Sequence, residues 1–235
     1  MTTAIKALNY TDHGKVKLLT KANHPHVKDQ QVIPVIVHEF ALAGAEMPIV
    51  FVKNTETGEF QPVALMGFKS DENVFCGQKK WRGSYVPAAI MHHPFALMPS
   101  RDDETQLQVI LMENSHLVNE VEGDDLFDDA GNETEYMQKR KEILGRYYEN
   151  MHLTRGFVNT LAKLELLSEQ VFTIDLDGKK TNLNGLYIVA EKKLNSLSKQ
   201  DFLALRKKGY LAPIYNHLSS VHQLNNLARL KTQPE

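Results

Sequence analysis

The feature that most constrains the fold is a long proline-free stretch in the middle of the chain, residues 133–167. Apolar residues recur in it at intervals of three and four, the spacing that places them along one face of an α-helix. We therefore expect a long helical segment, with Asn132 or Thr134 capping its start. Glycine weakens a helix by about 1 kcal/mol relative to alanine, so Gly156 favours a kink or break near residues 153–156.

The part of the chain before this helix is typical of β-structure. Short runs rich in β-branched and apolar residues occur at residues 31–37, 48–53, 61–68 and 106–112. Turn residues around Gly58 separate the second run from the third, which predicts an antiparallel hairpin. Pro34 in the first run favours an edge strand or an irregular one.

The last third of the chain combines a hairpin with helices. Asp177 and Gly178 separate two alternating runs, residues 170–176 and 181–189, and this pattern predicts a β-hairpin. Capping and stop residues then predict two helices, at residues 199–208 (ending before Gly209) and 212–230.

Together these elements predict an α+β fold with a β-rich N-terminal half, a long central helical segment, a β-hairpin and C-terminal helices. No linker rich in proline, glycine or serine divides the chain. We therefore expect a single domain over residues 1–235, with a β-rich part over about residues 1–115 and a mainly helical part over about residues 130–230.

Composition excludes several classes of protein. The single cysteine, Cys76, cannot form an intramolecular disulfide. The first residues lack the apolar core of a signal peptide, and no apolar run approaches the roughly 18 residues of a membrane helix. A net charge of −2 gives no reason to expect nucleic acid. We therefore expect a cytoplasmic protein without a nucleic-acid partner or membrane insertion.

The small net charge hides an uneven layout. Residues 101–135 contain one basic and twelve acidic residues, which gives −11, whereas residues 192–235 contain eight basic and two acidic residues, which gives +6. The loop over residues 120–135 holds eight carboxylates and no cation. It could bind a divalent cation, dock a basic partner, form a solvated loop that caps the long helix, or fold back onto the basic C-terminal helices.

The acidic loop does not follow the EF-hand pattern. With Gly131 at the sixth position, the first ligand would be Leu126. We expect Leu126 and its neighbour Phe127 to fasten the loop to the core.

Catalytic and cofactor motifs are missing from the sequence. None of the patterns G-x-S-x-G, G-x-x-x-x-G-K-[ST], G-x-G-x-x-G and H-E-x-x-H occurs. We therefore predict no catalytic residues and no cofactor. The alternative is a metal-dependent enzyme, for which His38, Glu39, His92 and His93 would have to meet in the fold near the acidic loop.

Residues 81–100 form the most distinctive segment. They contain the only tryptophan, together with an arginine, two further aromatic residues and three prolines. Tryptophan, tyrosine and arginine are enriched in binding hot spots, and proline keeps a segment extended. The predicted binding residues are Trp81, Arg82, Tyr85, Pro87 and Phe95. The structural alternative is a buried Trp–Tyr–Phe cluster in which the arginine satisfies backbone carbonyls.

The same segment resembles a known family. W-R-G-S-Y-V-P at residues 81–87, followed by H-P-F-A-L-M-P-S at residues 93–100, is similar to the SapC family of bacterial proteins. Further matches follow in order at residues 35–40, 47–51, 62–67, 122–128, 154–157, 161–164, 183–187, 214–218 and 224–230. The family is named for an association with bacterial surface layers, and it offers no catalytic residues to carry over.

The resemblance implies an accessory role, because related genes often neighbour those for halogenase-like enzymes and outer-membrane receptors. We therefore expect a non-enzymatic accessory or binding protein. Its partner would be a protein or peptide linked to surface-layer, uptake or halogenase-like systems, and a homo-oligomer is left open.

Overall fold

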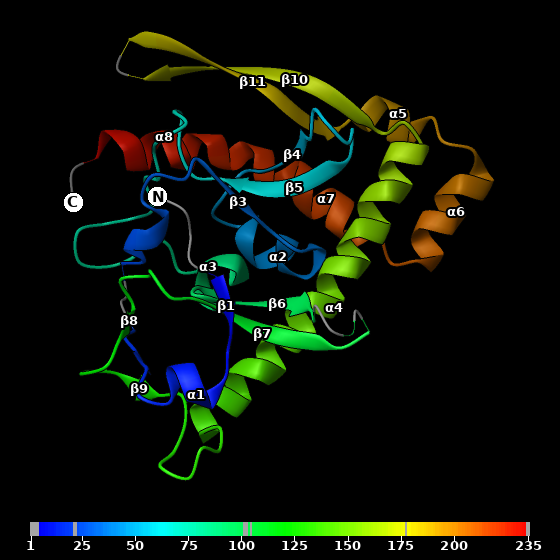
Figure 1. The fold of residues 1–235 in the computed structure, drawn as a ribbon. Coiled ribbons are helices and arrows are strands. Elements are labelled where there is room, and N and C mark those ends of the chain that lie inside the picture. The colour runs from blue at the N-terminus through cyan, green and yellow to red at the C-terminus, as the bar shows by residue number, and fades with distance from the viewer. Residues whose placement is uncertain (1–4, 21–22, 101–102, 104, 177, 234–235) are drawn as a thin grey trace.

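The computed structural model describes residues 5–20, 23–100, 103, 105–176 and 178–233. Over these residues the fold is α+β, as the sequence predicts (Figure 1). The elements follow the chain in this order: β1 (Ile5–Ala7), α1 (Tyr10–His13), β2 (Lys17–Leu18), η1 (Pro25–Val27), β3 (Val32–Pro34), η2 (Val37–Glu39), α2 (Phe40–Ala43), β4 (Ile49–Lys53), β5 (Phe60–Leu65), α3 (Ala88–His92), β6 (Phe95–Pro99), β7 (Leu107–Met112), β8 (Val118–Asn119), β9 (Asp124–Asp125), α4 (Glu135–Lys163), β10 (Leu167–Leu176), β11 (Lys179–Val189), α5 (Glu191–Asn195), α6 (Lys199–Lys207), α7 (Leu211–Ser220), η3 (Val221–Gln223) and α8 (Leu224–Thr232).

The largest sheet is antiparallel and has the strand order β10-β11-β4-β5-β3. Both predicted hairpins are confirmed: β4 pairs with β5, and β10 pairs with β11. Gly58 and Gly178 take the positive φ angles, +72° and +80°, that the two turns require. Asp177 lies outside the described residues. Two smaller sheets have the orders β1-β7-β6 and β8-β2-β9.

The strand expected over residues 31–37 is shorter than predicted. β3 pairs with β5 only from Val32 to Pro34, and the chain then turns into the 3-10 helix η2. A proline offers no N–H to a ladder, so a strand that reaches Pro34 ends readily there. β5 therefore continues past the end of its neighbour.

Helix α4 is the long helix expected from the sequence. Thr134 caps it, and its side chain accepts a hydrogen bond from the backbone N–H of Met137. The break expected near residues 153–156 does not occur: α4 runs uninterrupted through Gly156 to Lys163, and Figure 1 shows one continuous rod. Burial of the residues that follow Gly156 stabilises this stretch by more than the glycine costs.

The C-terminal helices follow the predicted pattern with one difference. Ser198 caps α6, and Gly209 has a φ of +73° beyond its end. The single helix expected over residues 212–230 is instead α7 and α8 joined by the 3-10 turn η3. At this joint the Ser220 hydroxyl donates to the His217 carbonyl and accepts from the Ile49 N–H.

The buried apolar side chains form two cores. The main core lies around the large sheet, with residues from α2, the C-terminal half of α4, α7 and α8. The second core lies under the sheet β1-β7-β6 and includes residues of β2 and the N-terminal half of α4. Helix α4 therefore serves both cores, with Met137 and Leu144 in one and Phe157 and Leu161 in the other.

Candidate functional site

The predicted binding residue Trp81 lies in the main core. Its side chain is only 6% exposed and stacks on Phe75, with ring centroids 5.4 Å apart. Its indole N–H donates to the Tyr85 carbonyl at 2.8 Å. The tryptophan therefore packs as the structural alternative expects.

Arg82 is tied to the end of the last helix. Its guanidinium donates to the carbonyls of Leu230 at 2.8 Å, Gln233 at 3.1 Å and Val74 at 3.3 Å. The C-terminal carbonyls of a helix have no partner inside the helix, and a cation is favourable beside them. Arg82 thus joins the Trp81 segment to α8.

Tyr85 and the residues after it surround Glu39. The Tyr85 hydroxyl donates to Glu39 Oε1 at 2.6 Å, and the Ala88 and Ile36 backbone N–H groups donate to the same carboxylate at 2.7 and 2.9 Å. Burial and this carboxylate raise the pKa of Tyr85. Glu39 thereby fastens the start of α3 to η2.

The last two predicted binding residues are also buried. Pro87 precedes α3, and Phe95 belongs to the second core whereas Trp81 belongs to the main core. The structure therefore does not bring the five residues together on one surface. Their direct contact with a partner stays a prediction.

The four residues of the metal-enzyme alternative do not form a ligand set. His38 is exposed, Glu39 is buried and engaged as described above, His92 packs on Tyr147, and His93 stacks on His26. Within the described parts of the chain, no group of three or more His, Cys, Asp or Glu side chains is placed to hold a metal ion.

The acidic loop pairs with lysines near it rather than with the C-terminal helices. Asp125 contacts Lys17 at 2.7 Å, and Glu133 contacts Lys141 at 2.9 Å. Figure 1 places β9 and the start of α4 far from α8. The expectation that the loop folds back onto the basic C-terminal helices is therefore wrong. Leu126, in this loop, is fully buried in the second core, as predicted.

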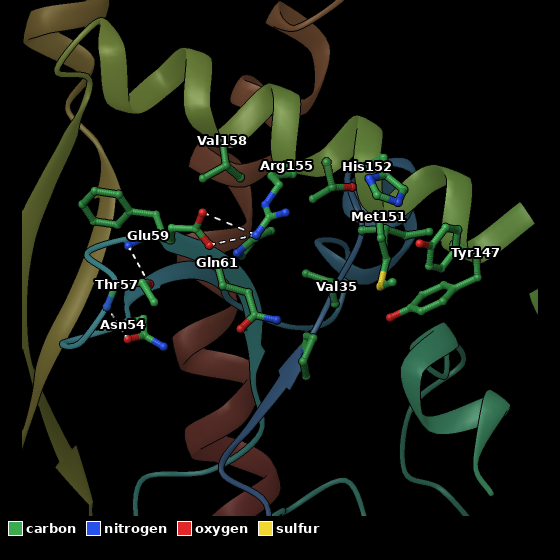
Figure 2. Close-up of a pocket in the computed structure, with 16 residues that line it drawn as sticks. Val35, Asn54, Thr57, Glu59, Gln61, Tyr147, Met151, His152, Arg155 and Val158 are labelled. Atoms are coloured by element: carbon green, nitrogen blue, oxygen red, sulfur yellow. Dashed lines mark hydrogen bonds and ion pairs between the residues drawn. The ribbon is translucent and has the colours of Figure 1, made fainter. Parts of the chain in front are cut away.

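A groove of about 470 Å³ lies between α4 and the neighbouring ends of β3 and β5 (Figure 2). One wall comes from the two strands and the turn before β5, and the other wall comes from the middle of α4. Its lining combines apolar, aromatic and polar side chains: Pro34, Val35, Ile36, Asn54, Thr57, Glu59, Phe60, Gln61, Pro62, Tyr147, Tyr148, Met151, His152, Thr154, Arg155 and Val158.

The strand wall of the groove exists because β3 ends early. Pro62 lacks an N–H, and its carbonyl accepts from the Val35 N–H at 3.2 Å, so this side of β5 faces β3. Backbone groups two residues apart in a strand point the same way. The N–H and C=O of Phe60 therefore also point away from β4, beyond the last residue of β3. This places a short stretch of strand edge in the groove.

The helix wall follows from the helical period. Tyr147, Met151 and Arg155 lie four residues apart and therefore share one face of α4. The Thr154 hydroxyl accepts from the Val37 N–H at 2.9 Å, which holds α4 against η2. Burial, with the charge of Glu39 nearby, raises the pKa of Tyr147 to about 12. Its hydroxyl is therefore neutral and can both donate and accept a hydrogen bond.

The rim of the groove carries one ion pair and two amides. Arg155 Nη2 lies 3.0 Å from Glu59 Oε2. The side-chain oxygen of Asn54 accepts from the N–H groups of Glu56 and Thr57 at 2.8 and 3.0 Å. Figure 2 shows Asn54 and Gln61 on the strand wall and the ion pair between Arg155 and Glu59 where the helix meets that wall.

The sequence predicts both walls of this groove but not the groove itself. Tyr147, Tyr148 and Met151 all fit the helical period as apolar positions. Adjacent residues cannot all face one core, so an apolar stripe this wide indicates a second, exposed contact surface. Met151 is 40% exposed.

The fold and the groove define an α+β protein with a concave site between a long helix and a sheet edge. The SapC family model matches residues 8–227 of the 235-residue chain, and the chain therefore belongs to the SapC family. This confirms the resemblance seen at residues 81–100. No curated protein and no solved structure matches the chain. Among the helices of the described residues, none has the length and apolar character needed to cross a membrane.

Proposed function

We propose that this SapC-family chain is a non-enzymatic accessory protein that binds an extended segment of a protein or peptide partner in the groove between α4 and β5. The observation that carries this proposal is the early end of β3 at Pro34. Beyond that end, the alternation of β5 turns the backbone N–H and C=O of Phe60 away from β4. An extended segment placed there would continue the position of β3 in the ladder.

The chemistry of the two walls supports an extended polypeptide as the occupant. Backbone hydrogen bonds to a strand edge provide affinity for any extended chain, and pockets for alternate side chains provide selectivity. Met151 and Val158 offer apolar contact, while Tyr147 combines apolar area with a polar tip. A cavity of about 470 Å³ has room for one large side chain or a few small ones.

The remaining parts of the proposal come from the family and the sequence. We place the protein in the cytoplasm, with a partner that belongs to surface-layer, uptake or halogenase-like systems. The proposal includes no nucleic-acid partner, no membrane insertion and no cofactor.

The first test is a selection from a library of short random peptides displayed on phage, with the folded full-length chain immobilised. Peptides selected on the wild type should bind Met151→Arg at least about tenfold more weakly. The peptide would cover the Met151 side chain in the complex, and the substitution puts a charge in place of that apolar contact. Leu153→Arg is the matched control. Leu153 is 56% exposed and lies on the same helix outside the groove, so binding should not change.

N-methylated copies of a selected peptide test the strand geometry. Methylation of the peptide N–H that donates to the Phe60 carbonyl should abolish binding, while methylation one residue away should be tolerated. Equal tolerance at every position would exclude strand pairing.

Arg82→Ala, once shown to be folded, reports on the site predicted from the sequence. If Arg82→Ala loses peptide binding and Met151→Arg does not, the binding site lies at the Trp81 segment and not in the groove.

A further inference from the structure

The geometry points to a carboxylate on the bound segment: we propose that Arg155 exchanges Glu59 for an acidic side chain or a C-terminal carboxylate of the ligand. This inference rests on the proposed function and adds the chemical class of the ligand. It concerns the rim of the groove, where α4 meets the turn before β5.

Only one nitrogen of the Arg155 guanidinium contacts Glu59. Both contacts to Glu59 come from Nη2, at 3.0 Å to Oε2 and 3.4 Å to Oε1. Among the described residues, no hydrogen bond from Nη1 or Nε is present. A guanidinium binds a carboxylate best through two parallel N–H bonds, and the Glu59 contact does not have that form. The ion pair is therefore easily exchanged.

Both partners of the ion pair are exposed to solvent. The side chains of Arg155 and Glu59 are 63% and 54% exposed. Exposed pairs of this kind contribute little to stability, so breaking the pair costs the fold little. An incoming carboxylate that also excludes water from the groove would bind the same guanidinium more strongly.

The rim offers more donors than acceptors to a ligand. The oxygen of Asn54 is already engaged with two backbone N–H groups, which leaves its NH₂ group as the end available to a ligand. Gln61 and the Phe60 backbone each offer one donor group and one acceptor group on this side of β5, so the excess of donors comes from Asn54 and from the unused N–H groups of Arg155. Glu59 is the only carboxylate among the lining residues, and Arg155 holds it. A ligand group with acceptor oxygens and negative charge matches this arrangement, whereas an ammonium group does not.

The probe is the peptide selected on the wild-type chain, together with copies in which each acidic residue is replaced by its amide. An acidic residue should recur at one fixed distance from the position where N-methylation abolishes binding. Its change to the amide should weaken binding to the wild type by about tenfold, the size typical for a charge-assisted pair. Against Arg155→Gln the acid and the amide should bind almost equally, because the partner of the charge is gone.

Two variants make the test specific. Glu59→Gln should tighten the acidic peptide several-fold, because it removes the carboxylate that competes for the guanidinium. Arg146→Gln is the matched control: Arg146 is an exposed residue of α4 outside the groove, and its change should leave the acid-to-amide ratio as it is in the wild type.

The outcomes separate this inference from the proposed function. Selected peptides that need Met151 but carry no recurrent acid would overturn the carboxylate inference and leave groove binding intact. The carboxylate inference would also be overturned if the acidic peptide and its amide bind the wild type equally, or if the selected peptides are enriched in basic residues. If no peptide depends on Met151, the proposed function itself fails.

Discussion

Replacement of His217 by alanine is expected to lower the free energy of unfolding by about 3–5 kcal/mol. His217 is fully buried and joins three elements. Its Nε2 accepts from the Val189 N–H of β11 at 3.0 Å, and its Nδ1 lies 2.8 Å from the Ile49 carbonyl of β4. Alanine would leave one buried donor, one buried acceptor and a cavity beside Phe51, whose ring centroid is 5.0 Å away.

Urea unfolding followed by circular dichroism measures this change. His222→Ala is the matched control, because His222 is an exposed histidine in η3, five residues along the chain. Its replacement should shift the free energy of unfolding by less than about 0.5 kcal/mol. A loss below about 1 kcal/mol for His217→Ala would show that the two hydrogen bonds do not contribute as inferred.

The second large effect expected is a loss of stability between about pH 6.5 and pH 4. The pKa values of His26, His92, His93 and His217 are each lowered to about 4, first of all by burial. In the unfolded chain these residues would titrate near pH 6.5. The unfolded state therefore takes up protons first as the pH falls. The free energy of unfolding that the neutral histidines contribute is therefore fully present above about pH 6.5, and it is lost as the pH approaches 4.

The geometry of these histidines explains why they remain neutral. The hydrogen bonds of His217 require a proton on Nδ1 and a lone pair on Nε2, so a second proton would face the Val189 N–H. The rings of His26 and His93 stack with centroids 4.1 Å apart. Protonation of both would place two cations in contact. His26 Nε2 lies 3.2 Å from the Ile90 carbonyl, and its Nδ1 is buried without a partner among the described residues.

Urea titrations at a series of pH values test this expectation. His26 and His93 are partly exposed, so their contribution is reduced by solvent. The four residues together should remove about 5 kcal/mol between pH 7 and pH 4.5. His93→Asn should flatten this dependence, whereas His222→Asn should leave it unchanged. Stability that is constant down to pH 4.5, and falls only where carboxylates titrate, would contradict the assignment.

Much of the fold could be predicted because its elements follow local rules. The period of the apolar residues defines α4, Thr134 caps it, and the two turns are set by glycines at positions that need positive φ. The structural alternative for Trp81 and Arg82 also follows from local chemistry, since a large indole and a chain of methylenes are stabilised by burial.

The groove and the position of the acidic loop could not be predicted in the same way. The groove depends on where β3 leaves the sheet and on the contact of α4 with β5. This contact joins residues far apart in the sequence, such as Glu59 and Arg155, which are 96 positions apart. The charge total of residues 120–135 suggested an attraction to the basic C-terminus. The loop instead finds Lys17 and Lys141 because Leu126 and Phe127 anchor it in the second core. The burial of Leu126 and Phe127 therefore determines where the acidic loop lies, and the nearby lysines pair with its carboxylates.

The contacts of Arg82 with α8 have a consequence for synthesis of the chain on the ribosome. Its acceptors, Leu230 and Gln233, are among the last described residues, and α7 and α8 supply Ile214, Leu227 and Leu230 to the main core. A nascent chain in which these residues have not yet been made cannot close the main core. Until they are made, the apolar faces of β4 and β11 lack the helices that cover them, and exposed apolar strands of this kind are prone to aggregation.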